Sequence, residues 1–204
     1  MTELGLFPLP LVLLPTERVP LHIFEPRYRE LIGECLDSGE EFGMIYADED
    51  GLRDVGTRTR VTEVLTRMAD GRMDILVEGG DRFRLVELTT GRSFQTGDVV
   101  PVEDEADPAG TGSIDRALGL FDSLRELTGS DVDVPDADTT QLSFVLAGRV
   151  ELPSDDKLLL LRDLSERSRM DRVCALLDEA MSTARRMREA AERAATNGRV
   201  HLGS

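Results

Sequence analysis

The first half of the chain has the hydrophobic pattern of a β-rich fold. Residues 4–104 consist mostly of short apolar and β-branched runs separated by turn residues, a pattern typical of strands. In one run, Met73, Ile75 and Val77 alternate with other residues, which places them on one face of a strand. The predicted strands cover residues 41–47, 57–68, 73–79, 81–88 and 98–104. Short strands at this spacing favour a small, strongly bent sheet or barrel.

Glycine and acidic residues indicate the turns between these strands. Ala69–Arg72 contains the Asp-Gly pair that is typical of a hairpin. Asp48–Gly51 predicts a solvated acidic turn. The two glycines in Val77–Phe83 predict a tight connection between two strands, because no helical pattern follows them as a dinucleotide-binding loop requires.

One segment in this half has the helical period instead. Pro26 suits the first turn of a helix because it has no N–H to leave unpaired, and Gly39 is a suitable C-terminal stop. Between them, apolar residues recur at the spacing of one helical face. These residues are Tyr28, Leu31, Ile32, Cys35 and Leu36. We therefore predict one helix directly after the apolar extended run Val19–Phe24.

The composition changes at Glu103–Ser113, which is polar and contains one proline and two glycines. After it the periodicity is helical, and Ser113 is a suitable N-cap for a helix that ends near Gly129. Further helices are predicted at about residues 139–150, from residue 154, and from about 168 to 195, the last with a heptad rhythm and an alanine-rich end. The predicted organisation is a β-rich domain of residues 1–107, a helical bundle domain of residues 111–195, and a disordered tail of residues 196–204.

Charge narrows the classes of partner. The chain has 40 Asp and Glu against 24 Lys and Arg, a formal net charge of −16. Such a charge repels phosphate backbones and anionic membrane surfaces, so we expect neither a nucleic acid nor a membrane as partner. Lys157 is the single lysine, and Gly-Lys-Ser/Thr does not occur, which excludes a phosphate-binding P-loop. The oligomeric state is left open by the sequence.

The N-terminus and the cysteines indicate the compartment. Leu4–Pro15 is apolar like the core of a signal peptide, but it follows Glu3 instead of basic residues, contains three prolines and is shorter than the ~20 residues of a membrane span. We predict a buried extended segment here. Cys35 and Cys174 lie far apart in apolar helical patterns, which predicts two buried thiols in a reducing compartment. We therefore predict a cytoplasmic protein.

Two short motifs suggest chemistry. Ser154 and Lys157 match the S-x-x-K pattern of serine acyl enzymes, but the accompanying Ser-Asp-Asn and Lys-Thr-Gly elements do not occur in the sequence. A hydrolase that uses Ser154 and Lys157 is an alternative. We favour the interpretation that Ser154 caps a helix, with Asp155 and Asp156 at the positive end of the helix dipole. On this interpretation the chain has no catalytic residue.

His22 and Glu25 have the spacing of a possible metal pair. Their odd separation places them on opposite faces of a strand, and the other histidine is His201, so a zinc site lacks ligands. We expect His22 to bond to neighbouring strand backbone and Glu25 to pair with Arg29 or another arginine. The acidic segments also lack the spacing of a calcium-binding loop. We predict no metal and no cofactor.

The residues resemble those of one known family, the N-terminal, substrate-binding domain of the ATP-dependent Lon protease. The resemblance covers about residues 4–180. Its most specific part is Pro20-Leu21-x-Ile23-Phe24-Glu25-x-Arg27-Tyr28, and Val77, Gly79 and Arg82 follow as a later element. Leu152–Glu179 resembles the family's compact helical segment, whereas Gly5 replaces a frequent proline. The resemblance implies an α+β fold, a PUA-like pseudobarrel with one helix followed by an α-helical bundle. It also implies a stand-alone form without the ATPase and Ser-Lys protease modules.

The function that follows from this resemblance is recognition without catalysis. We predict a module that binds polypeptide segments or a partner protein, through Pro20, His22, Phe24, Tyr28 and Arg82 or through a groove that faces the helical bundle. A small-molecule sensor is an alternative, although related ligand pockets lie in a zinc-containing domain for which this chain lacks the cysteines. An RNA-binding PUA-like protein is another alternative, suggested by the fold alone.

Overall fold

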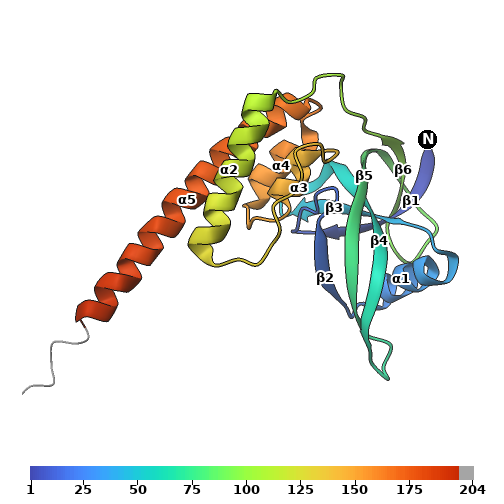
Figure 1. Cartoon of the computed structure of the whole chain (residues 1–204). Helices are drawn as coiled ribbons and strands as arrows, with labels where there is room; N and C mark the ends of the chain where they lie inside the picture. The colour runs from blue at the N-terminus through green and yellow to red at the C-terminus, as the bar shows by residue number, and fades with distance from the viewer. Residues whose placement is uncertain (198–204) are drawn as a thin grey trace, which may run out of the picture.

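The computed structural model describes the backbone of residues 1–197 and the side chains of residues 1–194 (Figure 1). The described strands are β1 (Thr2–Leu9), β2 (Arg18–Ile23), β3 (Phe42–Asp48), β4 (Gly51–Arg67), β5 (Met73–Thr89) and β6 (Thr96–Pro101). The described helices are α1 (Pro26–Ser38), α2 (Thr111–Thr128), α3 (Leu142–Ala147), α4 (Ser154–Arg162) and α5 (Glu166–Asn197). The predicted tail of residues 196–204 falls mostly outside the described residues, although α5 continues to Asn197.

The strands form one mixed sheet that closes on itself. The order is β2-β5-β4-β3-β1-β6, and β6 also pairs with β5. The 17 residues of β5 make this possible, because its first part pairs with β2, from Met73 to Glu78, and its last part pairs with β6, from Phe83 to Thr89. The ring is therefore β5-β4-β3-β1-β6, with β2 at a free edge. The predicted strongly bent β-rich sheet is confirmed.

A glycine inside β5 corrects one prediction. Val77–Phe83 was expected to connect two strands, but one strand runs through both glycines. A Cβ atom at Gly79 would lie 2.2 Å from the Leu14 carbonyl oxygen, and the Gly79 N–H donates to the Glu17 carbonyl at 3.0 Å. Gly79 is therefore required for the close approach of the segment between β1 and β2, and not for a turn.

Helix α1 has the predicted boundaries and buried face. Pro26 is its first residue, and Gly39 adopts a left-handed conformation with φ of 74° and donates its N–H to the Cys35 carbonyl. Tyr28, Leu31, Ile32 and Cys35 are buried, and they pack in one cluster with side chains of the barrel, such as Phe42 and Ile75. The amphipathic pattern therefore attaches the helix to the outside of the sheet (Figure 1).

The helical half is built on α2 and α5, which run in the same direction side by side (Figure 1). Their apolar faces share one buried cluster, and a hydrogen bond from Ser113 to Asp171 and an ion pair of Arg116 with Asp178 also join the two helices. Ser113 was predicted to cap α2, but the helix begins two residues earlier and the Ser113 hydroxyl donates to Asp171 Oδ1 at 2.9 Å. The helix predicted for residues 139–150 is confined to Leu142–Ala147.

The barrel and the helical half share a core. Val12, Leu14 and Val55 from the β-rich half lie in the hydrophobic cluster of the helices, together with Phe144 and Leu160. Segments predicted as separate domains therefore bury apolar surface against each other, and the division at residues 107–111 stays a prediction.

Charged side chains also connect the barrel with the helical half. Arg169, fully buried, binds both carboxylate oxygens of Asp104, at 2.7 and 2.5 Å, and its guanidinium lies 4.3 Å from the Phe144 ring centre. Arg82 binds the same carboxylate and lies on the same ring at 5.2 Å. Burial lowers the pKa of Arg82, and Asp104 opposes that shift. The network connects β5, the segment after β6, and α5.

Both cysteines are buried free thiols, at 8% exposure for Cys35 and 4% for Cys174, in different hydrophobic clusters. The predicted burial is confirmed. No helix in the described part of the chain is long and apolar enough to cross a membrane.

Candidate functional site

Three of the five residues predicted to bind a partner lie together on β2 and at its end. Pro20, His22 and Phe24 are exposed, and the Phe24 ring stacks on the His22 ring with their centres 5.8 Å apart. Phe24 is 58% exposed. Among the described strands, β2 pairs with β5 alone, so its other side is a free edge. Pro20 removes one backbone donor from this short edge strand, as edge prolines do.

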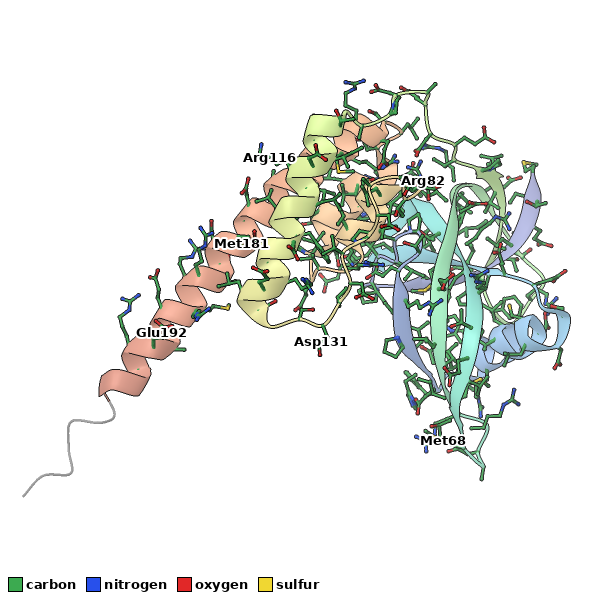
Figure 2. All side chains as sticks on the ribbon, in the orientation of Figure 1. Met68, Arg82, Arg116, Asp131, Met181 and Glu192 are labelled. Carbon is green, nitrogen blue, oxygen red and sulfur yellow. The ribbon has the colours of Figure 1, made fainter. Side chains whose placement is uncertain are left out.

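The other two predicted residues are buried elsewhere. Tyr28 packs on Phe7 with ring centres 4.1 Å apart, and burial raises its pKa. Arg82 lies between the barrel and the helices and donates to the carbonyls of Leu161 at 2.9 Å and Asp163 at 2.7 Å (Figure 2). The structure therefore gives these two side chains roles in the fold and does not bring them together with Pro20, His22 and Phe24.

The possible metal pair has other partners. His22 Nδ1 lies 2.6 Å from Asp74 Oδ1, so its partner is a side chain and the predicted backbone partner is wrong. Glu25 pairs with Arg27 at 2.8 Å, and not with Arg29. Within the described residues, no group of three or more His, Cys, Asp or Glu side chains is arranged to hold a metal ion, and His201 lies outside them.

Lys157 forms a buried ion pair with Glu17. Its Nζ donates to Glu17 Oε1 at 2.5 Å, with 9% and 8% of the two side chains exposed, and Glu17 Oε2 accepts the Leu14 N–H at 2.9 Å. Ser154 is the first residue of α4, and Pro153 occupies the cap position, so the predicted serine cap is wrong. The lysine of the S-x-x-K pattern is therefore a structural cation that pairs with the Glu17 carboxylate of the β-rich half.

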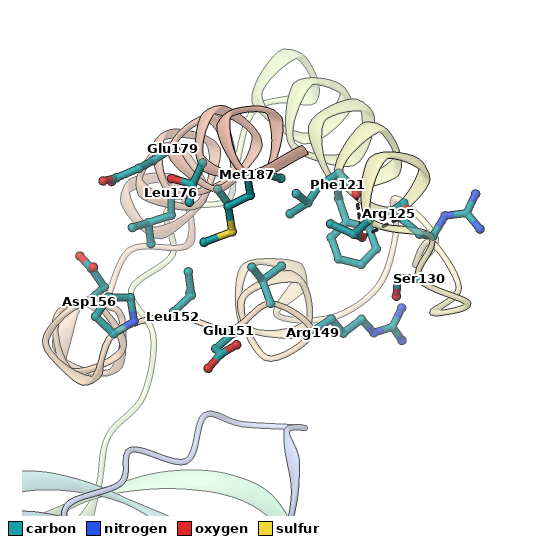
Figure 3. Close-up of a pocket in the computed structure, with 17 residues that line it drawn as sticks. Phe121, Arg125, Ser130, Arg149, Glu151, Leu152, Asp156, Leu176, Glu179 and Met187 are labelled. Carbon is teal, nitrogen blue, oxygen red and sulfur yellow. Dashed lines mark hydrogen bonds between the residues drawn. The ribbon is translucent and has the colours of Figure 1, made fainter. Parts of the chain in front are cut away.

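A groove lies in the helical half, between α2, α5 and the chain that leads from α3 into α4 (Figure 3). Its volume is about 530 Å³, within the range of about 300–1,000 Å³ of ligand clefts. Its apolar lining includes Phe121, Leu124, Val150, Leu152, Leu176 and Met187. We call it the α2–α5 groove.

Helix α2 forms one wall of the groove through Phe121, Leu124 and Thr128, and α5 forms another. Helix α2 ends at Thr128, with Gly129 as its left-handed C-cap at φ of 69°, whereas α5 continues to Asn197 and extends past α2 (Figure 1). Ala180 and Ala184, one turn apart on α5, line the groove and occupy little of it. Met187 follows at its outer end and is 69% exposed.

Charged side chains surround this apolar lining. Figure 3 shows Arg125 and Arg149 at one end, and Asp156 and Glu179 at the other, with Glu151 between them on the lower side. An apolar floor with a charged rim is the surface that amphipathic polypeptide segments recognise. The arrangement has the features of a binding site, an apolar cleft with a few convergent polar groups.

The groove was missed by the sequence patterns. Ala180, Ala184 and Met187 continue the heptad rhythm of α5, and the alanine-rich, charged later part of this helix predicts a segment that projects or packs weakly, which does not indicate a groove. The informative signal is the pair Ala180 and Ala184, because their small side chains leave space between α5 and the larger apolar side chains that line the groove.

These features define a class of protein, an α+β protein in which a small closed barrel shares its core with a helical bundle that carries an apolar groove. Residues 3–179 match the family described as the ATP-dependent protease La (LON) substrate-binding domain, and the chain belongs to this family. The resemblance found in the sequence is confirmed.

Individual relatives agree with this assignment. The chain is 22% identical over 183 residues to Lon protease 1 of Hydrogenovibrio crunogenus and 25% identical over 184 residues to Lon protease 2 of Myxococcus xanthus. Each alignment covers 82% of this chain and 22% of the relative, so the chain spans about a fifth of their length.

Solved structures show the same fold. The Lon N-terminal domain protein from Xanthomonas campestris is 25% identical, with a TM-score of 0.66 over 86% of this chain and 98% of that one. The N-terminal domain of Mycobacterium avium complex Lon protease is 16% identical, with a TM-score of 0.66 over 89% of this chain and 98% of that one. The predicted α+β fold is confirmed.

Proposed function

We propose that this chain is a non-enzymatic recognition module that binds polypeptide segments in the α2–α5 groove. The observation that carries the proposal is the groove itself, about 530 Å³ of mostly apolar surface with charges at its rim. Burying apolar side chains there stabilises a complex by about 25 cal/mol per Å² of apolar area before the costs of ordering the segment. Membership of a substrate-binding domain family supports the same function.

Two observations support the proposal that this chain is non-enzymatic. The family match is to the substrate-binding domain, over residues 3–179. The ammonium group of Lys157, the lysine of the S-x-x-K pattern, donates a hydrogen bond to Glu17 in a buried pair and is not free to act as a base.

We also propose a reducing, cytoplasmic setting, because both cysteines are buried free thiols.

The exposed cluster at β2 is a second candidate location for the same function. Phe24 and His22 form an aromatic pair beside a free sheet edge, and such an edge can accept an extended peptide. The two locations differ, since the cluster consists of a few exposed side chains on and after β2 whereas the groove encloses a volume of about 530 Å³. We therefore place the main contact in the groove.

One experiment separates the two locations. A fluorescently labelled peptide rich in Leu and Phe is titrated with the intact chain, and anisotropy reports the Kd. Ala184→Phe fills the groove, and we expect it to weaken binding by at least tenfold. Ala175→Phe makes the same change on an exposed face of α5 away from the groove, and we expect it to leave the Kd unchanged.

Phe24→Ser tests the β2 cluster in the same assay. Phe24 is largely exposed, so its loss costs little stability. If Phe24→Ser abolishes binding and Ala184→Phe does not, the groove is the wrong location. If the wild-type chain binds no apolar peptide, the proposed function is wrong. Circular dichroism confirms that each variant is folded before its Kd is compared.

A further inference from the structure

The charges at the rim of the α2–α5 groove are not equally available to a ligand. Arg125 is held by Asp122 at 2.7 Å, and Arg149 donates to the Asp133 carbonyl. The hydrogen bond that Arg125 donates to Asp122 raises the pKa of Arg125, with further contributions from Glu126 and Asp133. The basic end of the groove is therefore already surrounded by acidic residues and acceptors of the chain itself.

The acidic end is less well paired. Glu151 and Glu179 are exposed, and within the part of the chain that the structure describes neither carboxylate has a hydrogen bond or ion pair. Asp156 has Arg172 at 3.9 Å, a long contact beside an exposed arginine. The unpaired charge at the rim is thus negative, and it lies next to the apolar side chains of Leu152 and Leu176 (Figure 3).

We infer that the α2–α5 groove selects unfolded polypeptide segments in which apolar side chains adjoin Lys or Arg. This inference rests on the proposed function and names its substrate class. The apolar side chains fill the space over Ala180 and Ala184, and a cationic side chain reaches Glu151, Glu179 or Asp156 at the rim. Long basic side chains suit this geometry, because their aliphatic stems cover apolar surface while the charged end stays in water.

The charge of the whole chain acts in the same direction. A net charge of −16 attracts cationic segments and repels acidic ones over a distance of about 10 Å at 0.1 M salt. A segment without charge is neither attracted nor repelled by this field. The difference in Kd between cationic and acidic segments with the same apolar side chains therefore measures the electrostatic part of recognition separately from the apolar part.

The test uses the intact chain and three labelled peptides that share one Leu- and Phe-rich core. Their flanks are Lys-Lys, Gln-Gln or Glu-Glu. We expect the Lys-flanked peptide to bind about tenfold more tightly than the Glu-flanked one, and the preference to shrink as salt is raised. Two exposed ion pairs correspond to a change of about threefold to tenfold in Kd.

A matched pair of double variants locates the effect. Glu151→Gln with Glu179→Gln removes the two unpaired carboxylates of the groove, and we expect the preference for Lys flanks to fall to about twofold while the Gln-flanked peptide keeps its Kd. Glu49→Gln with Glu63→Gln removes the same charge from exposed positions of the β-rich half. We expect that control to retain the full preference.

The outcomes distinguish the two proposals. If none of the peptides binds, the proposed function fails. If all three bind equally and Ala184→Phe weakens each, the groove binds peptides and the inference about charge is wrong. If the control variant loses the preference as strongly as the groove variant, net charge and not the rim is responsible, and the inference is wrong. Sedimentation of the chain without peptide tests whether a second copy of the chain occupies the groove. A dimer that dissociates when peptide is added would overturn the inference that the groove selects unfolded segments.

Discussion

The buried pair of Lys157 and Glu17 gives the sharpest prediction about stability. These residues are 140 positions apart and join α4 to the segment between β1 and β2. Lys157→Met keeps the size of the side chain and removes its charge, which leaves the Glu17 carboxylate buried at 8% exposure without its cation. Removing one member of a buried ion pair costs about 3–5 kcal/mol. We therefore expect the free energy of unfolding to fall by that amount.

A double variant tests the reason for this loss. Glu17→Gln in the Lys157→Met background removes the second charge but keeps an oxygen that can accept the Leu14 N–H, which Glu17 binds at 2.9 Å. Because neutral groups of similar volume often replace a buried pair without loss, the double variant recovers about 2–4 kcal/mol of the single variant's loss. Arg116→Met, in a pair that is 63% and 49% exposed, costs about 0–1 kcal/mol and is the control (Figure 2).

Urea denaturation followed by circular dichroism measures all three variants. The expected order of stability is wild type and Arg116→Met highest, the double variant next, and Lys157→Met lowest. If Lys157→Met lowers the free energy of unfolding no more than Arg116→Met does, Lys157 is not a buried structural cation. That result would reopen the hydrolase alternative, because the lysine would then be free for chemistry.

Two further predictions concern the barrel and the thiols. We expect Gly79→Ala to lower the free energy of unfolding by about 3 kcal/mol, because the new Cβ would meet the Leu14 carbonyl. Gly33→Ala is the control: a Cβ at Gly33 meets no atom within 4 Å, so this change stabilises α1 by about 0.5–1 kcal/mol. Equal urea midpoints for the two variants would contradict the close approach of Leu14 to Gly79. Burial raises the pKa of Cys35 from 9.0 to about 11 and also raises that of Cys174. Both thiols should therefore react slowly with a disulfide reagent at pH 8 until denaturant is added, and stability should fall as pH rises from about 9 to about 11, because the unfolded chain loses the Cys35 proton first. Immediate reaction of both thiols in the folded chain would refute their burial.

Local chemistry explains which parts of the fold the sequence predicts. Helix α1 is predicted to the residue because a proline at its start and a glycine at its end act through their own backbone preferences. The burial of Cys35 follows from the same helical period. The start of α2 is missed because Ser113, a good cap by its chemistry, is used by Asp171 from α5.

Contacts between distant segments explain what the sequence leaves out. Gly79 has the appearance of a turn residue until Leu14, 65 positions earlier by residue number, lies against it. Phe24 and Tyr28 are four positions apart, yet Phe24 is exposed after the end of β2 and Tyr28 is on the buried face of α1. The α2–α5 groove is lined by α2, by α5 and by the chain after α3, and no single segment contains that information.

Methionine methyl NMR tests the central proposal most directly. The chain has 7 methionines, and Met187 lines the α2–α5 groove whereas Met68 lies at the far end of the barrel, by the turn between β4 and β5 (Figure 2). With methyl-labelled methionine and a saturating Lys-flanked apolar peptide, we predict that the Met187 signal shifts strongly and the Met68 signal stays in place. Binding of the peptide with an unchanged Met187 signal would contradict recognition in the groove.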